Sequence, residues 1–290
     1  STGTLVWTKQ LGTSGEDRGN AVAIDSNNNV YITGYTFGNL DGPNSGSADA
    51  FLAKYDSAGT LVWTKQLGTS AKDDAQGVAI DSNNNVYITG YTASNLAGPN
   101  AGAFDIFLAK YNSAGINQWT KQLGTSGYDV PLKVAIDSNN NVYITGYTDG
   151  NLGGTNAGSN DAFLAKYDSS TGTLVWTKQL GTSTSDIARN VAIDSNNNVY
   201  ITGHTGGNLA GQNAGAINTN DAFLAKYDSV GNNEWTKQLG TSALDAAFGV
   251  AVDSNNNVYI TGYTAGNLNG TNAGLYDVFL AKYDSTGTNQ

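Results

Sequence analysis

The chain alternates short apolar runs with polar turns, and the same succession occurs five times. In the first copy, Val22–Asp25 and Val30–Thr36 flank a run of three asparagines. Valine, isoleucine, tyrosine and threonine suit a pleated, half-buried strand, and asparagine tolerates the positive φ of a tight turn. We therefore predict a β-hairpin here, and its core DSNNNVYITG recurs unchanged from Asp81, Asp137, Asp194 and Asp253.

Two further apolar runs follow in each copy and complete a larger unit. In the first copy these are Phe51–Tyr55 and Leu61–Leu67, and no stretch shows the 3.6-residue period of a helix. Four short strands in a unit of this size, repeated along a chain, indicate a blade of a β-propeller. Tryptophans spaced by 56 to 59 residues mark the period: Trp7, Trp63, Trp119, Trp176 and Trp235.

The two ends of the chain share one register, because both read Ser-Thr-Gly-Thr just before the position of a tryptophan. We predict an all-β, five-bladed β-propeller with four antiparallel strands per blade. Residues 4–11 would pair with 279–283 and complete the last blade, which removes an exposed sheet edge; an arbitrary cut from a longer array is the alternative. The single domain 1–290 would comprise repeats 12–67, 68–123, 124–180, 181–239, and 240–290 with 1–11.

The repeated sequence resembles a known family. VAIDSNNNVYITGYT, followed by DAFLAKYDSAGTLVWTKQLG, is similar to the bacterial β-propeller repeat that is named for seven blades, the SBBP repeat. The resemblance covers essentially the whole chain, although this chain has five units. It implies a structural repeat of extracellular and cell-surface bacterial proteins, and it carries no catalytic motif.

Composition narrows the class of protein. The net charge of −10 argues against a nucleic-acid partner, because phosphates require a basic patch. The chain has no cysteine, which excludes disulfides and zinc–thiolate sites, and no apolar run is long enough for a membrane helix. It contains no methionine and no signal peptide. We therefore expect a monomeric portion of a larger protein that is secreted or lies on a bacterial cell surface.

The repeats differ mainly in two loops. By analogy with WD-type propellers, the loop 12–20 and the loop 37–48 should share one face, with the asparagine turns on the opposite face. Loops on a rigid scaffold commonly carry function, and relaxed drift of exposed loops is the other explanation. We expect a non-catalytic scaffold that binds an unidentified protein or glycan through this variable face, with a lectin-like, calcium-stabilised sugar binder as the alternative.

The variable face also offers candidate ligand-binding residues. A Gly-Asn-Leu phrase recurs in these loops, and an asparagine amide beside an aromatic ring is typical of sugar sites. The aromatic residues do not fall at one repeat position, which favours a single asymmetric patch over five equal sites. The candidates are Phe37, Asn39, Phe104, Tyr128, Phe248 and Tyr276.

Aspartates provide the candidate metal ligands. The run that begins at Asp25 resembles the start of a calcium loop but lacks its glycine and its later glutamate, so we interpret it as a structural turn. Two other sets recur on the variable face, where aspartate either accepts backbone N–H bonds or binds calcium; no other cofactor is expected. The sets are Asp17, Asp73, Asp129, Asp186 and Asp245, and Asp49, Asp105, Asp161, Asp221 and Asp277.

Catalytic residues are scarce. A glycoside-acting enzyme needs a pair of carboxylates with different roles, whereas the only glutamates, Glu16 and Glu234, have no evident partner. His204 is the only histidine and replaces a tyrosine of the other copies, with no motif of a serine hydrolase around it. We expect that the protein is not an enzyme, and a glycosidase is the third alternative.

Overall fold

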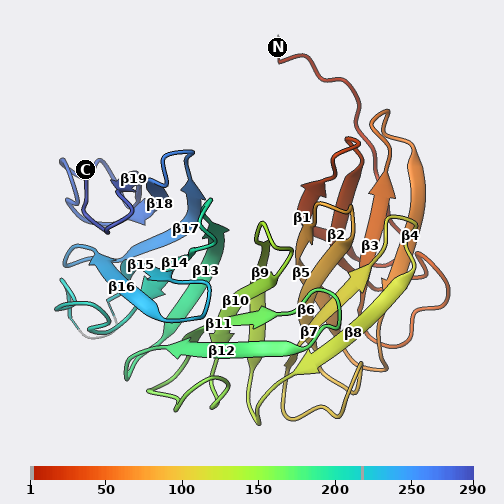
Figure 1. Ribbon diagram of the computed structural model, residues 1–290, viewed down its shortest axis with the longest axis horizontal. Coiled ribbons are helices and arrows are strands. Elements are labelled where there is room, and N and C mark those ends of the chain that lie inside the picture. Colours follow the sequence, from red (N-terminus) through yellow and green to blue (C-terminus); the bar gives the residue numbers. More distant parts are fainter. Residues whose placement is uncertain (1–2, 217–218) are drawn as a thin grey trace. The chain divides into compact units, whose positions relative to one another are not determined.

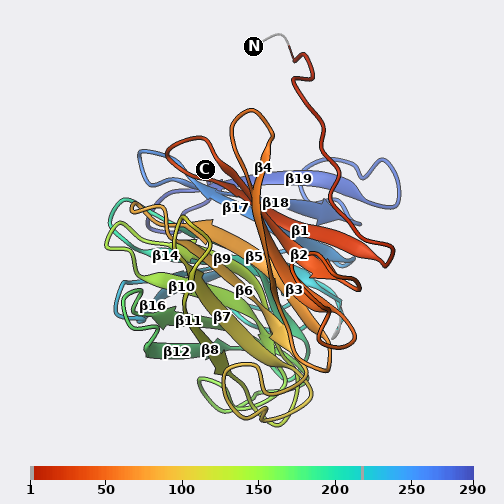
Figure 2. The ribbon, with the colours of Figure 1, turned by 90° about the vertical axis from the view of Figure 1, so that its right-hand side faces the viewer.

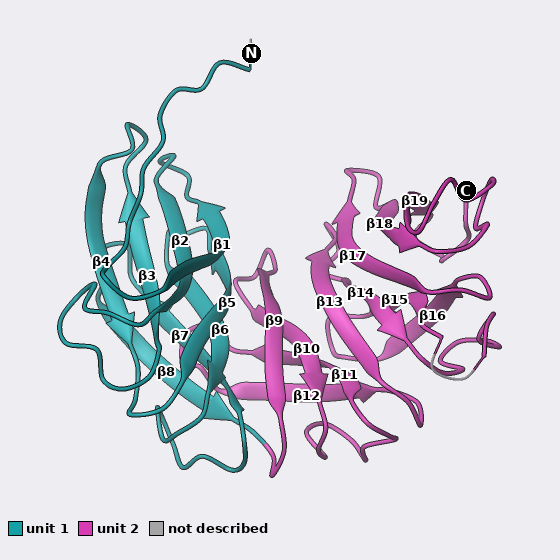
Figure 3. Ribbon diagram, turned by 180° about the vertical axis from the view of Figure 1, so that it is seen from behind, with its two compact units in different colours: residues 1–124 teal, residues 125–290 magenta. Residues whose placement is uncertain are grey.

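The protein is built from β-strands. The computed structural model describes residues 3–216 and 219–290, and every regular element in these ranges is a strand. No helix in the described residues could cross a membrane. The chain divides into two compact units, Ser1–Gly124 and Thr125–Gln290 (Figures 1 and 3).

The first unit contains two four-stranded antiparallel sheets, and the strand order in each sheet follows the chain. The first sheet consists of β1 (Asp17–Ile24), β2 (Val30–Thr36), β3 (Asp49–Tyr55) and β4 (Leu61–Leu67). The second consists of β5 (Asp73–Ile80), β6 (Val86–Thr92), β7 (Asp105–Tyr111) and β8 (Asn117–Leu123).

The second unit repeats this pattern. One sheet consists of β9 (Asp129–Ile136), β10 (Val142–Thr148), β11 (Asp161–Tyr167) and β12 (Leu174–Leu180). The next consists of β13 (Asp186–Ile193), β14 (Val199–Thr205), β15 (Asp221–Tyr227) and β16 (Asn233–Leu239). The last has three strands, β17 (Asp245–Val252), β18 (Val258–Thr264) and β19 (Asp277–Tyr283).

The invariant hairpin between the first two strands is fixed by its aspartate. Asp25 Oδ1 accepts hydrogen bonds from the backbone N–H groups of Asn27 and Asn29, and Oδ2 accepts bonds from the Asn29 amide and the Tyr31 hydroxyl. Asn28 has a φ of 62°, which asparagine adopts more readily than other residues with a side chain. The carboxylate is thus occupied by the turn itself, as expected for a structural role.

The same hairpin also joins neighbouring sheets. Ser26 donates its hydroxyl to Asn84 Oδ1, in the hairpin of the next sheet, at 3.0 Å. Ser195 bonds to Asn256 in the same way in the second unit. The turn therefore serves both its own hairpin and the contact between sheets, and these two requirements account for its constancy.

The first strand of each sheet is longer than the sequence pattern indicates. The predicted strand began at Val22, with residues 12–20 as a loop, but β1 begins at Asp17. A β-bulge between Gly19 and Ala21 leaves Asn20 as the extra residue. The prediction of a loop was therefore wrong for residues 17–20, because the polar and irregular sequence at a bulge hides its pairing with β2.

The cores lie between neighbouring sheets within each unit. In the first unit, Tyr31 and Leu52 of one sheet pack with Val86, Ile88 and Phe107 of the next. The outer strand contributes its tryptophan to the same contact: a Cβ atom on Gly115 would lie 3.0 Å from the Trp63 ring. Trp176 approaches Gly231 and Trp235 approaches Gly287 in the same manner. The periodic tryptophans are therefore packing residues.

The expected closure of the fifth blade is not confirmed. The sheet of β17, β18 and β19 has no fourth strand, and residues 3–16 form no strand before β1 (Figure 2). Instead, Trp7 lies on Gly59, where a Cβ atom would be 2.8 Å from the ring, and Leu11 packs on Phe51, Ala53 and Tyr55. Residues 3–16 thus contact the first sheet.

Candidate functional site

The two ends of each sheet differ in character. We call the end that carries the β2–β3 loop and the loop before the next sheet the variable end, and the opposite end the hairpin end. Within each unit, loops of neighbouring sheets meet at the variable end, since Asp73 N donates to Ala48 O and Asp245 N donates to Asn220 O, both at 2.7 Å. A cavity of about 380 Å³ opens there, lined by Thr182, Thr184, Asn208 and Gln212 among others.

The β-bulges contribute variable residues of the repeats to this end. Each first strand has a bulge at the same position, and each bulge leaves one residue without a pairing partner on the second strand. Bulges often redirect side chains near functional sites. The five bulge residues all differ: Asn20, Gln76, Leu132, Arg189 and Phe248.

In the first unit, the bulge residues join a polar cluster whose hydrogen bonds are satisfied. The buried Asp74 carboxylate accepts bonds from Asn20 Nδ2 at 2.9 Å, from Gln76 Nε2 at 2.8 Å and from the Tyr91 hydroxyl at 3.0 Å. Lys72 donates to the Tyr91 hydroxyl at 2.7 Å and forms an ion pair with Asp74 at 3.6 Å. Charge is therefore balanced inside this cluster.

In the second unit, the bulge residues are surrounded by aromatic rings. The Arg189 guanidinium lies over the Phe248 ring, 5.5 Å from its centre. Tyr263 contacts Phe248 and also Tyr276, with ring centres 5.7 and 4.7 Å apart. Phe248 and Tyr276 remain 45% and 56% exposed, so this aromatic surface is accessible to a ligand.

The predicted aromatic candidates lie against one repeated position, although they are irregular in the sequence. Phe37 packs on Tyr35, and Phe104 packs on the equivalent Tyr91. Phe248 and Tyr276 both pack on Tyr263, the next equivalent residue. The backbone N–H of Tyr128 donates to Asp149 Oδ1 at 2.6 Å, beside the equivalent Tyr147. The candidates are divided between the two units.

Asn39 has a structural partner. Its Oδ1 accepts the backbone N–H of Asn44 at 2.8 Å, and the four equivalent asparagines make the same bond. The adjoining Leu40 packs against Phe51, Ala53 and Tyr55, as expected of a residue that anchors the loop. The Asn39 carbonyl is thus committed to its own loop.

The sequence did not identify the bulge residues, except Phe248. It also did not identify the residues that pair with the repeated tyrosines. Asp74 pairs with Tyr91 across β5 and β6, and Ile187 pairs with His204 at the equivalent place in β13 and β14. One signal was present in the sequence, because the position of Tyr35 and Tyr91 is occupied by His204 in a single copy. The role of His204 depends on Arg189, and the sequence pattern alone does not show that these two residues interact.

The two candidate sets of metal ligands open the first and third strands of the sheets. Their carboxylates hold the preceding loops: Asp73 Oδ2 accepts the Thr69 backbone N–H at 2.6 Å, and Asp49 Oδ2 accepts that of Ser45 at 2.9 Å. This is the loop-fixing role that we weighed against calcium binding. The calcium ligands themselves stay a prediction.

Members of the two sets interact across neighbouring sheets. The charge of Asp49 acts on Asp73, and that of Asp161 acts on Asp186. All four are buried. The side chains of Thr92 and Thr205 bond to Asp73 and Asp186, whereas the Oδ1 oxygens of Asp49 and Asp161 have no hydrogen-bond partner among the described residues. A proton, a water molecule or a cation would satisfy these oxygens. The described residues include no group of three or more histidine, cysteine, aspartate or glutamate side chains that could hold a metal.

Replacing Asp186 by asparagine should change how stability depends on pH. Burial raises the pKa of Asp186 above its ordinary value, so the protonated acid favours folding. The protonated Asp186 contributes its full stabilisation at a pH below the pKa that it has in the unfolded chain. This stabilisation is lost as the pH rises through the pKa that it has in the folded protein. The free energy of unfolding of Asp186→Asn, relative to wild type, should therefore increase between about pH 3 and pH 7.

Asp168→Asn is the matched control, because bonds from Ser170 and Thr171 lower the pKa of Asp168 to about 2. Its relative stability should fall with rising pH, since the stabilisation is present above the unfolded pKa. Urea unfolding at several pH values measures both differences. If the relative free energies of unfolding of the two variants changed with pH at the same slope, the raised pKa of Asp186 would be contradicted. A chelator should leave the wild-type values unchanged, whereas a decrease would indicate calcium at the paired carboxylates.

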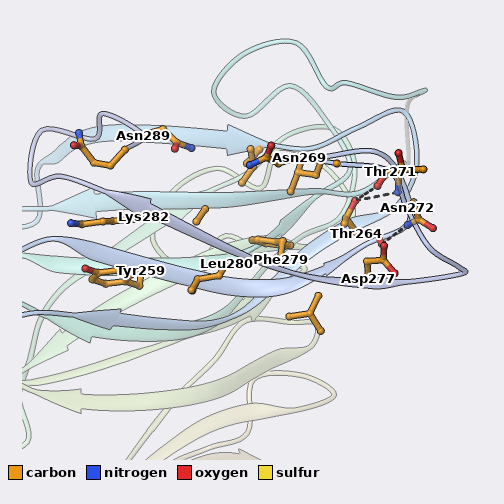
Figure 4. A pocket seen from close by; sticks show the side chains of 17 residues that line it. Tyr259, Thr264, Asn269, Thr271, Asn272, Asp277, Phe279, Leu280, Lys282 and Asn289 are labelled. Atoms are coloured by element: carbon orange, nitrogen blue, oxygen red, sulfur yellow. Dashed lines mark hydrogen bonds between the residues drawn. The ribbon is translucent and has the colours of Figure 1, made fainter.

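Another cavity lies on the fifth sheet. It measures about 590 Å³ and is lined by Leu239, Tyr259, Phe279, Leu280 and Lys282 together with residues near the C-terminus (Figure 4). Leu280 is 72% exposed, whereas the equivalent Leu224 is fully buried by the sheet that follows it. Consecutive residues of β19, from Asp277 to Lys282, line the cavity, so it runs along the strand edge where the other four sheets have a fourth strand, and we do not assign it to a ligand.

Comparison with solved structures agrees with the fold. The chain aligns with the WD40 domain of Pan2 from Neurospora crassa, with a TM-score of 0.54 and 9% identity, over 94% of this chain and 64% of that one. It also aligns with a protein from Bacteroides caccae, with a TM-score of 0.52 and 11% identity, over 98% and 85% of the two chains. At these identities the likeness concerns the fold alone.

Sequence comparison identifies the repeat. A WD repeat-containing protein of Acanthamoeba polyphaga mimivirus is 29% identical over 230 residues, and the regulatory protein FlaEY of Caulobacter vibrioides is 28% identical over 143 residues. These matches cover 61% and 46% of this chain but only 16% and 15% of the relatives. The model of the β-propeller repeat SBBP matches residues 6–41, 62–97, 118–153, 175–210 and 234–269, more than half of the chain. The chain therefore belongs to the SBBP β-propeller repeat family.

Proposed function

We propose that the protein is a non-catalytic binding scaffold whose variable end holds a polypeptide partner. One observation carries this proposal: five structurally equivalent bulge positions bear five different side chains, whereas the DSNNNVYITG hairpin is the same in all five repeats. The hydrogen bonds of the uniform turns account for the constancy of the hairpin end. At the bulges, Asn20 and Gln76 are held by the Asp74 carboxylate, whereas Phe248 at the equivalent position stays 45% exposed. The similarity to a WD repeat-containing protein supports a binding role.

The glutamates also support a scaffold rather than an enzyme. Glu16 accepts a hydrogen bond from the Tyr35 hydroxyl, and Glu234 forms an ion pair with Lys226 at 2.7 Å. A glycosidase needs one carboxylic acid and one carboxylate on either side of the scissile bond. Glu16 instead bonds to β2, and Glu234 pairs with a residue of its own sheet.

Selection of peptides from a random library on the immobilised protein tests the proposal. Binders should lose at least about tenfold in affinity towards Phe248→Ala and Tyr276→Ala, because large exposed aromatics commonly dominate binding surfaces. Val62→Ala and Val175→Ala are matched controls, because both valines are exposed at the hairpin end. If peptide affinity fell for the valine variants and not for the aromatic ones, recognition would occur at the hairpin end, which would contradict the proposal.

A lectin-like function is the second candidate, and the exposed rings of Phe248 and Tyr276 favour it, since sugars stack on aromatic faces. A glycan array with the same four variants separates the two candidates. Sugar binding that depends on the aromatic residues and needs calcium would favour the lectin. We place the protein among secreted or cell-surface bacterial proteins on its composition, which fractionation of the source cells would test.

We also propose that the frame is a closed, five-bladed ring in a monomer. Trp7 and Leu11 contact the first sheet as Trp63 and Leu67 of β4 contact the second, so residues 4–11 lie where the outer strand of a preceding sheet would be. The fifth sheet lacks this outer strand beside β19. Pairing of residues 4–11 with β19 would supply it and would leave no sheet edge open.

A further inference from the structure

No described residue forms an ion pair with Arg189. It is the extra residue of the bulge in β13, between Ala188 and Asn190. Its Nε is buried and has no hydrogen-bond partner, and the guanidinium makes no hydrogen bond or ion pair with residues 3–216 or 219–290. A buried donor without a partner is costly, so such a group invites a ligand.

His204 feels the charge of this arginine, and its Nδ1 also lacks a hydrogen-bond partner among the described residues. The residue is only 7% exposed. Burial and then the charge of Arg189 lower the pKa of His204 to about 4. The imidazole is therefore neutral at physiological pH, and one of its nitrogens carries a proton that it can donate.

The second repeat shows what is missing around Arg189. There the bulge residue Gln76 donates to Asp74, which lies two positions earlier in β5. The equivalent of Asp74 in β13 is Ile187, and the charged or titratable neighbours that act on Arg189 are Tyr147 and Tyr263. The fourth repeat thus has a cationic bulge residue and no carboxylate to match it.

We propose that Arg189 and His204 bind a carboxylate of the ligand, which supplies the negative charge that Asp74 supplies in the second repeat. The exposed rings of Phe248 and Tyr276 receive an apolar or aromatic group next to that carboxylate. This inference rests on the proposed binding function and names the chemistry of the partner. A C-terminal carboxylate that follows an aromatic residue has both features.

The charges favour a carboxylate over a phosphate. With His204 neutral, Arg189 supplies one positive charge, which balances one carboxylate. A phosphate dianion would keep an uncompensated charge in a protein whose net charge is −10. Arginine binds a carboxylate through two parallel N–H bonds, and hydrogen bonds to charged groups are the stronger ones.

Titration with N-acetylphenylalanine, followed by calorimetry or NMR, tests the proposal. The acid should bind with a millimolar dissociation constant, and N-acetylphenylalaninamide should bind at least about tenfold more weakly. Arg189→Leu and His204→Tyr introduce side chains that the chain already uses at the equivalent positions 132 and 35. Arg189→Leu should weaken binding of the acid at least about tenfold and His204→Tyr severalfold, with melting temperatures that confirm folding.

Four results would overturn the inference. The acid does not bind up to about 10 mM, the amide binds equally well, the folded Arg189→Leu protein binds normally, or inorganic phosphate binds more tightly than the acid. The last result would assign the site to phosphate. If selected peptides still required Phe248 and Tyr276, the proposed binding function would stand without the carboxylate site. A failure of the carboxylate site can therefore be distinguished from a failure of the proposed function.

Discussion

Replacing Gly90 with alanine is expected to destabilise the protein by about 3 kcal/mol or more, at the upper end of the cost of overpacking. Gly90 lies in β6 opposite the bulge of β5, and a Cβ atom there would lie 2.0 Å from the Asp74 carbonyl oxygen. The obstacle is backbone, so no change of side-chain rotamer relieves it. Urea unfolding of the purified variant measures the loss.

Gly98→Ala is the matched control in the same unit, since the nearest atom to its Cβ would be 3.9 Å away. Its free energy of unfolding should stay within about 0.5 kcal/mol of wild type. Equal losses for the two variants would show that the bulge does not depend on the glycine. The equivalent positions Gly34, Gly146, Gly203 and Gly262 meet a carbonyl oxygen at 1.8 to 2.0 Å, so the requirement is general.

The repeated strands could be predicted because their local pattern and their packing agree. Val30–Thr36 and Leu61–Leu67 have the bounds that their apolar residues indicate. The hairpin could be predicted for the same reason, since Asn28 has the positive φ that an asparagine turn suggests.

The bulges could not be predicted, because their determinants lie on two strands. The glycine of VYITG lies within a predicted strand, and its close contact with a carbonyl oxygen of the first strand appears only after pairing. Residues 17–20 look like a loop in isolation. The cluster of Arg189 and His204 was hidden in the same way, since the two side chains come from different strands and no motif connects them.

Deleting residues 1–11 is expected to cause the other large effect. The deletion removes Trp7 and Leu11 from the first sheet, and both side chains are partly buried there, so their apolar contacts are lost together. Under the proposed closure it also leaves β19 as an open edge, which promotes pairing with other molecules. We expect a melting temperature lower by many degrees and a shift from monomer to oligomers, measured by calorimetry and light scattering. A stable monomeric deletion variant would contradict both the packing role of Trp7 and Leu11 and the proposed closure beside β19.

A disulfide test separates closure from simple packing of the N-terminal segment. In the complete sheets, Ala53 of β3 pairs with Thr64 of β4, and Ala225 pairs with Thr236. Closure in this register places Thr8 opposite Ala281, so the variant Thr8→Cys/Ala281→Cys should form an intramolecular disulfide in a chain that otherwise has no cysteine. Thr8→Cys/Val278→Cys, three residues out of register, should remain reduced. Covalent dimers from the first pair would mean that residues 4–11 complete the sheet of another molecule, and equal oxidation of both pairs would mean that the strand has no fixed register.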